Sequence, residues 1–244
     1  MNNFQGWLNI YKPIGITSFT VVKKIKKYFN INKIGHGGTL DPLAEGVLPI
    51  AIGKTTKLIP FINTDIKEYE FEIKWGVQTS TDDAEGEIIH KSDFIPTDSE
   101  IIRALRNFKG EILQKPPKAS AIKINGKRAY ILLRSKKNFE VKEKKVHIYS
   151  SKIIESYNYK SSTKIKIKCG KGFYVRSYAR DLAEFLNTKG HVISLKRTKV
   201  GKFTYKNANL LDDLLKIGQT LTEFKDFHSS VSMLDDILAY EIDD

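Results

Sequence analysis

Hydrophobic and charged residues alternate strictly from position 69 to 75. Tyr69, Phe71, Ile73 and Trp75 share one side, and the residues between them are charged. A period of two is typical of a strand with one buried face. A second alternation predicts a strand over 163–169 that buries Cys169 as a small core residue, and shorter apolar runs predict strands at 7–11, 47–52, 146–155 and 191–198.

Apolar residues recur at helical spacing in three other segments, 17–29, 97–109 and 174–186. Thr17 or Ser18 is expected to cap the first helix, and Thr97 or Asp98 the second. A shorter helix is expected at 55–61. The residues expected to face inward are Val21, Val22, Ile25, Tyr28 and Phe29 in the first helix, Ile101, Ile102, Leu105 and Phe108 in the second, and Val175, Tyr178, Ala179, Leu182, Phe185 and Leu186 in the third.

The segment 35–46, Gly-His-Gly-Gly-Thr-Leu-Asp-Pro-Leu-Ala-Glu-Gly, fits neither period. Its glycines and proline disfavour a regular helix, so we expect a shaped loop, called the aspartate loop below. Next to its glycines the loop carries the carboxylate of Asp41 and one ring that titrates near neutrality, His36. It runs into an apolar strand that can anchor it.

Two structural alternatives apply to this loop. Asp41 before Pro42 is also the pattern of a helix start, with the aspartate as N-cap and the proline at the first helical position. Glutamate stands at 45 rather than 44, so no capping box forms. A phosphate-binding loop ending at Gly53-Lys54-Thr55 is rejected, because its first glycine would fall on Leu48.

Composition narrows the class of protein. The chain has 244 residues and 41% hydrophobic content, which is ample for a packed core. No apolar run approaches about 20 residues and the N-terminus lacks a signal-peptide pattern, so we expect a cytoplasmic protein without a membrane partner. One cysteine cannot form an internal disulfide, and five scattered histidines form no cluster at ligand spacing. We therefore expect no metal and no other cofactor.

The net charge of +13 is concentrated in one block. Between positions 115 and 171 there are 17 Lys and Arg against 3 acids, a net of +14, whereas 208–244 has 9 acids against two lysines, a net of −7. A concentrated basic field attracts a polyanion. Lysine enrichment from an AT-rich genome is the alternative, but it does not explain the clustering.

The basic block opens with a turn-rich arm. Pro116-Pro117 stiffens its start, and Asn125-Gly126 predicts a tight turn. Basic residues around an aromatic suit contact with a nucleic-acid backbone. The residues expected to bind RNA are Lys118, Lys123, Lys127 and Arg128, called the arm cluster below.

The aspartate loop and the following Val-Leu-Pro resemble the signature of the bacterial tRNA pseudouridine-55 synthases, the TruB family. Further motifs of the family occur in order, and the resemblance spans about 6–203. These motifs are Tyr11-Lys12-Pro13, Lys67-Glu68-Tyr69, Pro116-Pro117 through Ser120-Ala121, Gly170-Lys171-Gly172-Phe173-Tyr174-Val175-Arg176 and the segment 191–197. The resemblance implies an α+β fold, the pseudouridine synthase catalytic fold, with a long mixed, largely antiparallel sheet flanked by helices. It also implies a thumb insertion at about 115–145, called the basic arm below, that grips the T arm of tRNA.

The resemblance also assigns roles. Asp41 is implied as the catalytic carboxylate, oriented by Arg176, and Tyr69 as the residue that stacks on the uracil. Tyr174 and Leu195 would line the substrate pocket, and His36 would help to hold a flipped-out nucleotide. From the residues alone, a core aromatic is the default interpretation of Tyr69, and a surface arginine at a helix start is the alternative for Arg176. Asp83 matches an acidic position of the family near the substrate, but is equally a turn cap, and it is left out of the predicted site.

Two departures from the family pattern bear on the prediction. Gly37 stands where many members carry threonine, and a net-acidic stretch of only about 40 residues follows the catalytic part in place of an RNA-binding PUA domain. We expect a catalytic domain over 1–207 and a short acidic tail over 208–244. We also expect a monomer that binds tRNA and needs no protein partner. A non-catalytic RNA-binding protein, or an enzyme for another RNA such as ribosomal RNA, is the alternative.

Overall fold

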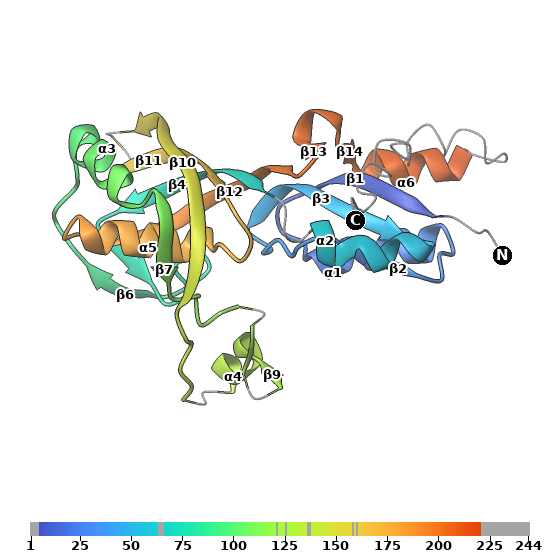
Figure 1. Ribbon diagram of the computed structural model, residues 1–244, viewed down its shortest axis with the longest axis horizontal. Helices are drawn as coiled ribbons and strands as arrows, with labels where there is room; N and C mark the ends of the chain where they lie inside the picture. Colours follow the sequence, from blue (N-terminus) through green and yellow to red (C-terminus); the bar gives the residue numbers. More distant parts are fainter. Residues whose placement is uncertain are drawn as a thin grey trace, which may run out of the picture. The chain divides into compact units, whose positions relative to one another are not determined.

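The computed structural model describes residues 5–62, 66–120, 122–124, 126–135, 138–157, 159 and 161–220. The chain forms two compact units, Met1–Lys67 with Lys196–Asp244, and Glu68–Leu195. We call them unit 1 and unit 2 and treat each by itself. Figure 1 shows their elements coloured along the sequence.

Unit 1 is built on a sheet with the strand order β14-β1-β3-β12. All seven residues of β1 (Gly6–Lys12) pair antiparallel with β3 (Ala44–Ile52). The shorter strands are β2 (Ile34–His36), β13 (Phe203–Thr204) and β14 (Asn209–Leu210), and the end of β12 (Gly190–Val200) also belongs here. Nearly every side chain of β1 and β3 is buried, as expected for strands covered on both faces.

Helix α1 (Ser18–Tyr28) begins at the predicted cap, since the Thr17 side chain accepts a hydrogen bond from the backbone N–H of Thr20. It buries Val21, Val22 and Ile25, whereas Tyr28 is exposed, contrary to prediction. The expected short helix is a 3-10 turn, η1 (Gly53–Leu58), followed by α2 (Ile59–Ile62). The other helices of unit 1 are η3 (Tyr205–Asn207) and α6 (Leu211–Thr220).

Unit 2 continues with the strand order β12-β4-β11-β10-β7. The strict alternation is confirmed, because β4 (Lys67–Trp75) buries every second residue from Lys67 onward. Strand β11 (Ser162–Cys169) likewise buries Ile165, Ile167 and Cys169, so the cysteine is a core residue. Strands β10 (Lys144–Tyr157) and β7 (Gly110–Gln114) complete the sheet.

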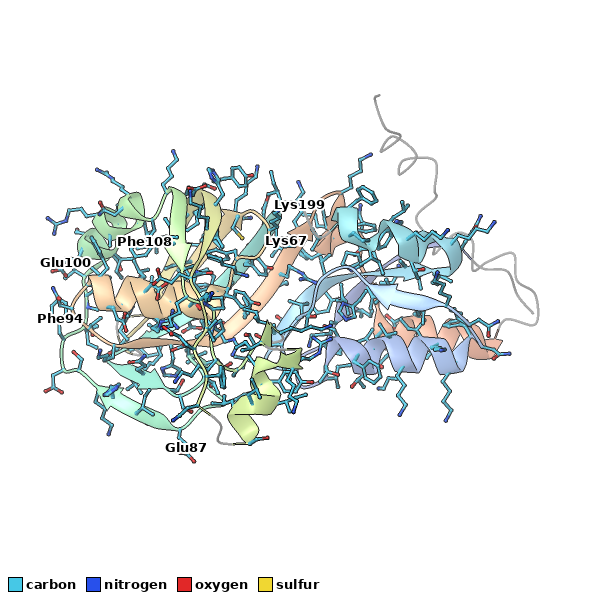
Figure 2. All side chains as sticks on the ribbon, turned by 60° about the horizontal axis from the view of Figure 1, so that its bottom comes forward. Lys67, Glu87, Phe94, Glu100, Phe108 and Lys199 are labelled. Carbon is cyan, nitrogen blue, oxygen red and sulfur yellow. The ribbon has the colours of Figure 1, made fainter. Side chains whose placement is uncertain are left out.

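The helices of unit 2 are α3 (Asp98–Asn107) and α5 (Val175–Phe185). Thr97 and Glu100 form a capping box at the start of α3, and Phe108 ends it (Figure 2). Ile102 and Phe185 were predicted to face inward and are about half exposed. The buried stripe of α3 is narrower than predicted, because Ile101, Ala104 and Leu105 already fill it.

Two small hairpins and a short helix complete unit 2. Strands β5 (Val77–Thr79) and β6 (Ile88–Lys91) form one hairpin, which the sequence did not predict. In the basic arm, β8 (Lys123–Ile124) pairs with β9 (Lys127–Arg128) and leads into α4 (Ala129–Arg134). The predicted Asn-Gly turn falls between β8 and β9, with Gly126 at φ 80°, although Asn125 and the motif residue Ala121 lie outside the described residues.

The α+β fold with a mixed, largely antiparallel sheet is confirmed. Among the described strand pairs, β1 pairs parallel with β14 at the edge, whereas β1 with β3, β10 with β11 and β10 with β7 pair antiparallel. Within the described chain, no helix is both long and apolar enough to span a bilayer. The division into a domain over 1–207 and a tail over 208–244 stays a prediction. Residues 209–220 of that tail form β14 and α6, and 221–244 lie outside the described residues.

Candidate active site

Ser18 fixes the residue that precedes Asp41. Its hydroxyl accepts a hydrogen bond from the backbone N–H of Leu40 at 2.8 Å and donates one to the Leu40 carbonyl at 3.0 Å. Both side chains are buried, at 1% and 4% exposure. One hydroxyl thus satisfies both polar groups of a buried peptide residue, and the backbone of the aspartate loop is held to the first residue of α1.

The backbone around Asp41 is a turn. The N–H of Ala44 bonds to the Asp41 carbonyl at 3.1 Å, and the N–H of Gly15 bonds to the Pro42 carbonyl at 2.8 Å. Strand β3 begins at Ala44, so no helix follows Asp41. The N-cap alternative for Asp41 is therefore wrong, and its side chain is half-buried at the head of a strand.

Arg197 holds the loop from β12. Its side chain is almost completely buried and donates from Nε to the Val47 carbonyl at 2.8 Å and from Nη2 to the Gly38 carbonyl at 3.0 Å. Gly46 has φ 107°, and a Cβ there would collide with the Arg197 backbone. Only glycine allows this close approach of β3 to β12.

His36 lies on β2 and is half-buried. Burial lowers its pKa, and the nearby positive charge of Arg197 lowers it further. The ring is thus neutral at physiological pH, and its buried Nδ1 has no hydrogen-bond partner within the described part of the chain. The next residue, Gly37, is tied to the Pro49 carbonyl through its N–H at 2.8 Å. The absence of the threonine typical of the family therefore leaves the backbone anchored here.

In unit 2, Arg176 lies in the first turn of α5 and is 5% exposed, so it is not a surface arginine. Its Nη1 lies 3.2 Å from Oδ2 of Asp83 and donates to the Thr81 carbonyl at 3.1 Å. Its Nη2 donates to the Ala119 carbonyl at 3.0 Å. A buried cation at the positive end of a helix is thus balanced by a carboxylate and by carbonyl dipoles.

Asp83, which the sequence prediction left out, is the buried carboxylate that pairs with Arg176. It is 2% exposed, and its Oδ1 accepts from the Thr81 hydroxyl at 2.5 Å and from the Glu85 N–H at 3.0 Å. These are the bonds of a turn-forming aspartate, so the turn-cap interpretation is also correct. The signal in the sequence was two adjacent acids, Asp82 and Asp83, whose arginine partners, Arg180 and Arg176, are remote in sequence.

Tyr174 is fixed through its backbone. Its N–H donates to Oε1 of Gln114 at 2.8 Å, and its carbonyl accepts from Nε2 of the same side chain at 3.1 Å. The ammonium of Lys144 lies 4.6 Å from the Tyr174 ring centroid. Burial lowers the pKa of Lys144.

Tyr69 and Leu195 are each 8% exposed. This burial fits both interpretations of Tyr69, as a residue of the substrate pocket and as a core aromatic, so its role stays a prediction.

All four side chains of the arm cluster are exposed. Within the hairpin, Lys123 stands directly opposite Arg128. Like charges facing each other across a strand pair are destabilising, so this placement suits an anionic ligand better than it suits the isolated fold. The role of the arm cluster in RNA binding stays a prediction.

Helix α5 secures the root of the basic arm. The Ser177 hydroxyl and Nη2 of Arg180 both donate to the Lys115 carbonyl, each at 2.8 Å. Arg180 also bonds to Asp82 at 2.9 Å and to Asp181 at 2.8 Å. Burial raises the pKa of both aspartates, and the arginine opposes that shift in each.

The structure brings Arg176, Tyr174 and the arm root together at the start of α5. His36 ends β2, and Asp41 lies in the turn that leads into β3. The predicted pairing of Asp41 with Arg176 joins residues of different units and stays a prediction. Among the residues described, no group of three or more His, Cys, Asp or Glu side chains could hold a metal ion.

Solved structures share this fold. A chain of a Cbf5-Nop10-Gar1 complex matches with a TM-score of 0.72 and 28% identity, over 93% of this chain and 59% of that one. A chain of an H/ACA RNP bound to a substrate RNA containing 2′-deoxyuridine matches with a TM-score of 0.65 and 26% identity, over 86% and 52%. The fold is thus that of the pseudouridine synthases.

The sequence comparisons give the family. Residues 26–175 match the model of the TruB family pseudouridylate synthase N-terminal domain, and 176–239 match that of the tRNA pseudouridylate synthase B C-terminal domain. This chain belongs to the TruB family. It is 47% identical to the tRNA pseudouridine synthase B of a Wolbachia strain over 88% of this chain and 61% of the relative. The Caulobacter vibrioides protein of the same name is 43% identical over 98% and 77%.

Proposed function

We propose that this protein converts the uridine at position 55, in the T loop of tRNA, to pseudouridine. The reaction breaks the N1–C1′ bond of the nucleotide, turns the uracil and forms a C5–C1′ bond. No electrons are gained or lost and no group is donated, so the chemistry needs no cofactor.

Asp41 is the proposed catalytic residue. Its carboxylate either attacks C1′, so that the N1–C1′ electron pair leaves with the uracil, or removes the C2′ proton to give a glycal. Arg176 is proposed to orient Asp41 and favour its charged form. Tyr69 is proposed to stack on the uracil and to handle the C5 proton that is lost after the new bond forms.

The remaining roles concern the substrate. Tyr174 and Leu195 are proposed to line the pocket of the flipped-out nucleotide, and the neutral ring of His36 to hold it by a hydrogen bond. The arm cluster is proposed to contact phosphates of the T arm. We also propose that the protein acts as a monomer in the cytoplasm, which light scattering and cell fractionation would test.

The observation that carries the proposal is the fixed position of one carboxylate. The hydrogen bonds of Ser18 and Arg197 hold the aspartate loop from both sides of Asp41, in a chain that belongs to the TruB family. A protein that only binds RNA gains nothing from a carboxylate presented to a polyanion, because the two repel each other.

Tritium release from a tRNA transcript labelled at C5 of uridine tests the function, because pseudouridine formation replaces that C–H bond. The wild-type protein should release one equivalent, and none from a transcript with cytidine at position 55. Asp41→Asn should lower the rate at least about 1,000-fold while leaving tRNA binding largely intact. The matched control is Asp93→Asn, in an exposed loop, which should react like the wild type.

Two results would refute this proposal. Release of tritium from the cytidine-55 transcript would place the reaction at another uridine. Substantial turnover by Asp41→Asn would show that the Asp41 carboxylate is not required for the reaction.

A further inference from the structure

The exposed side of α1 carries four lysines and no acid. Lys23, Lys24, Lys26 and Lys27 are exposed, whereas Val21, Val22 and Ile25 form the buried side. We call these four lysines the α1 lysine face. They lie outside the basic block of 115–171, in a different unit from the basic arm. Figure 2 shows long, nitrogen-tipped side chains extending away from this helix.

This arrangement costs stability in the free protein. Three of the lysine pairs are three or four residues apart, and like charges at this spacing destabilise a helix. None of the four forms an ion pair with a carboxylate of the described residues. A surface that only confers solubility would mix the two signs.

Helix α3 provides that comparison within the same chain. Its exposed or half-exposed charges are Asp98, Glu100, Arg103 and Arg106, two of each sign. A general enrichment in lysine through genome composition would affect both helices alike. The single sign of the α1 lysine face is therefore a local feature of α1.

An exposed aromatic ring lies on the same side of α1. Phe19 is 71% exposed and stands one helical turn before Lys23, so the two side chains are neighbours. Ile14, four residues before α1, is also exposed, at 59%. An exposed ring beside unpaired cations is the combination that binds single-stranded nucleic acid, because bases stack on the ring and phosphates meet the cations.

The α1 lysine face begins where the aspartate loop is anchored. Ser18, which bonds both polar groups of Leu40, directly precedes Phe19 in the chain. Gly15, which bonds to the Pro42 carbonyl, directly follows Ile14. These bonds tie the start of α1, with the exposed side chains of Ile14 and Phe19, to the aspartate loop within unit 1.

We propose that the α1 lysine face, together with Phe19, is a second RNA-binding surface, separate from the basic arm. It binds the RNA strand that continues from the nucleotide held at Asp41, with Phe19 stacking on a base and the lysines contacting phosphates. The proposal rests on the proposed function, because that function places RNA at the aspartate loop.

Equilibrium binding of a tRNA transcript over a range of salt concentrations tests the lysines. The variant Lys23→Gln/Lys27→Gln is compared with Arg103→Gln/Arg106→Gln, which removes the same charge from the exposed side of α3. The first should lower the slope of log affinity against log salt by about 1.4–1.8 units, since each phosphate contact contributes about 0.7–0.9. The second should leave the slope unchanged. Equal changes in both variants, or no change in either, would overturn the proposal.

Phe19→Ala tests the stacking and should weaken binding about 5- to 100-fold, as expected for the loss of one stacked base. Phe61→Ala, at 65% exposure in α2, is the control and should bind like the wild type. Equal binding by both variants would show that Phe19 does not contribute to RNA binding. Circular dichroism verifies that each variant is folded.

Turnover of the transcript by the wild-type protein tests the proposed function separately. If no pseudouridine forms, that function fails, and the salt slopes still decide whether the α1 lysine face contacts RNA.

Discussion

Replacing Ser18 with alanine removes one oxygen from the structure and leaves two buried backbone groups without a partner. The Ser18 hydroxyl bonds both the N–H and the carbonyl of Leu40, and both residues are at most 4% exposed, so water cannot replace it without opening the loop. Each buried polar group left unpaired costs about 1–3 kcal/mol. The higher helix propensity of alanine at the start of α1 offsets about 0.5 kcal/mol of this loss in the free energy of unfolding.

The expected net loss is about 2–5 kcal/mol in the free energy of unfolding. Urea denaturation followed by circular dichroism measures it. The matched control is Ser99→Ala, which makes the same change at an exposed serine in the first turn of α3 and should lie within about 0.5 kcal/mol of the wild type.

The same substitution should slow the reaction, because Leu40 and Asp41 are adjacent. A displacement of about 1 Å at a reacting group can cost on the order of 100-fold in rate. We expect kcat to fall about 10- to 100-fold under conditions where the variant is fully folded, with a smaller change in KM. A variant as stable and as active as Ser99→Ala would refute the assignment of Ser18 as the anchor of the aspartate loop.

Three further predictions follow from charges in the structure. Neutralising the arm cluster should flatten the salt slope of tRNA binding by up to about 3–4 units with a much smaller effect on turnover at saturating tRNA, and an unchanged slope would show that the cluster is solvated surface. Folding lowers the pKa of His36, so the unfolded chain binds more protons than the folded chain near pH 6, and the folded protein loses stability as the pH falls below the unfolded pKa of this ring. His36→Gln should therefore make the free energy of unfolding less dependent on pH between 7.5 and 5.5, and an unchanged pH dependence would contradict this assignment. Asp83→Asn should cost about 3–5 kcal/mol by leaving Arg176 without its buried carboxylate, and a double-mutant cycle with Arg176→Gln should show coupling, whereas additive effects would contradict the ion pair.

The regular elements with a strong period were predictable from the sequence. The alternation that starts at Tyr69 predicted the strand β4, and the capping pattern at Thr97 predicted the start of α3; the structure confirms both. The hairpin β5–β6 was not predicted, because all four residues of β6 are exposed and so carry no hydrophobic period. Strand β7 was missed for a similar reason, since it lies at the edge of the sheet and only Gln114 is fully buried.

The candidate site was predictable where one segment carries it. Glycine and proline content predicted that 35–46 is a shaped loop, which the structure confirms for 37–43, with Asp41 in a turn, whereas 35–36 end β2 and 44–46 begin β3. The anchors of that loop, Ser18 and Arg197, lie 22 and 159 residues from the backbone groups that they bind at Leu40 and Gly38. No local pattern reveals such a bond, because either residue would read as a helix cap or a surface charge without the fold.

The bonds at the base of the basic arm separate it into a fixed part and an exchangeable part. The carbonyls of Lys115 and Ala119 are both bonded to side chains of α5, so bending of the arm is restricted to positions beyond 119. Past that point the described elements of the arm are a two-stranded hairpin and one short helix, and none of them takes part in the bonds at the root. The described residues of these elements, 123–124 and 127–134, can therefore be replaced by those of a relative while α5 and Arg176 keep their positions. Under the proposed function, the reach of the arm along RNA is then a property that engineering can change in isolation.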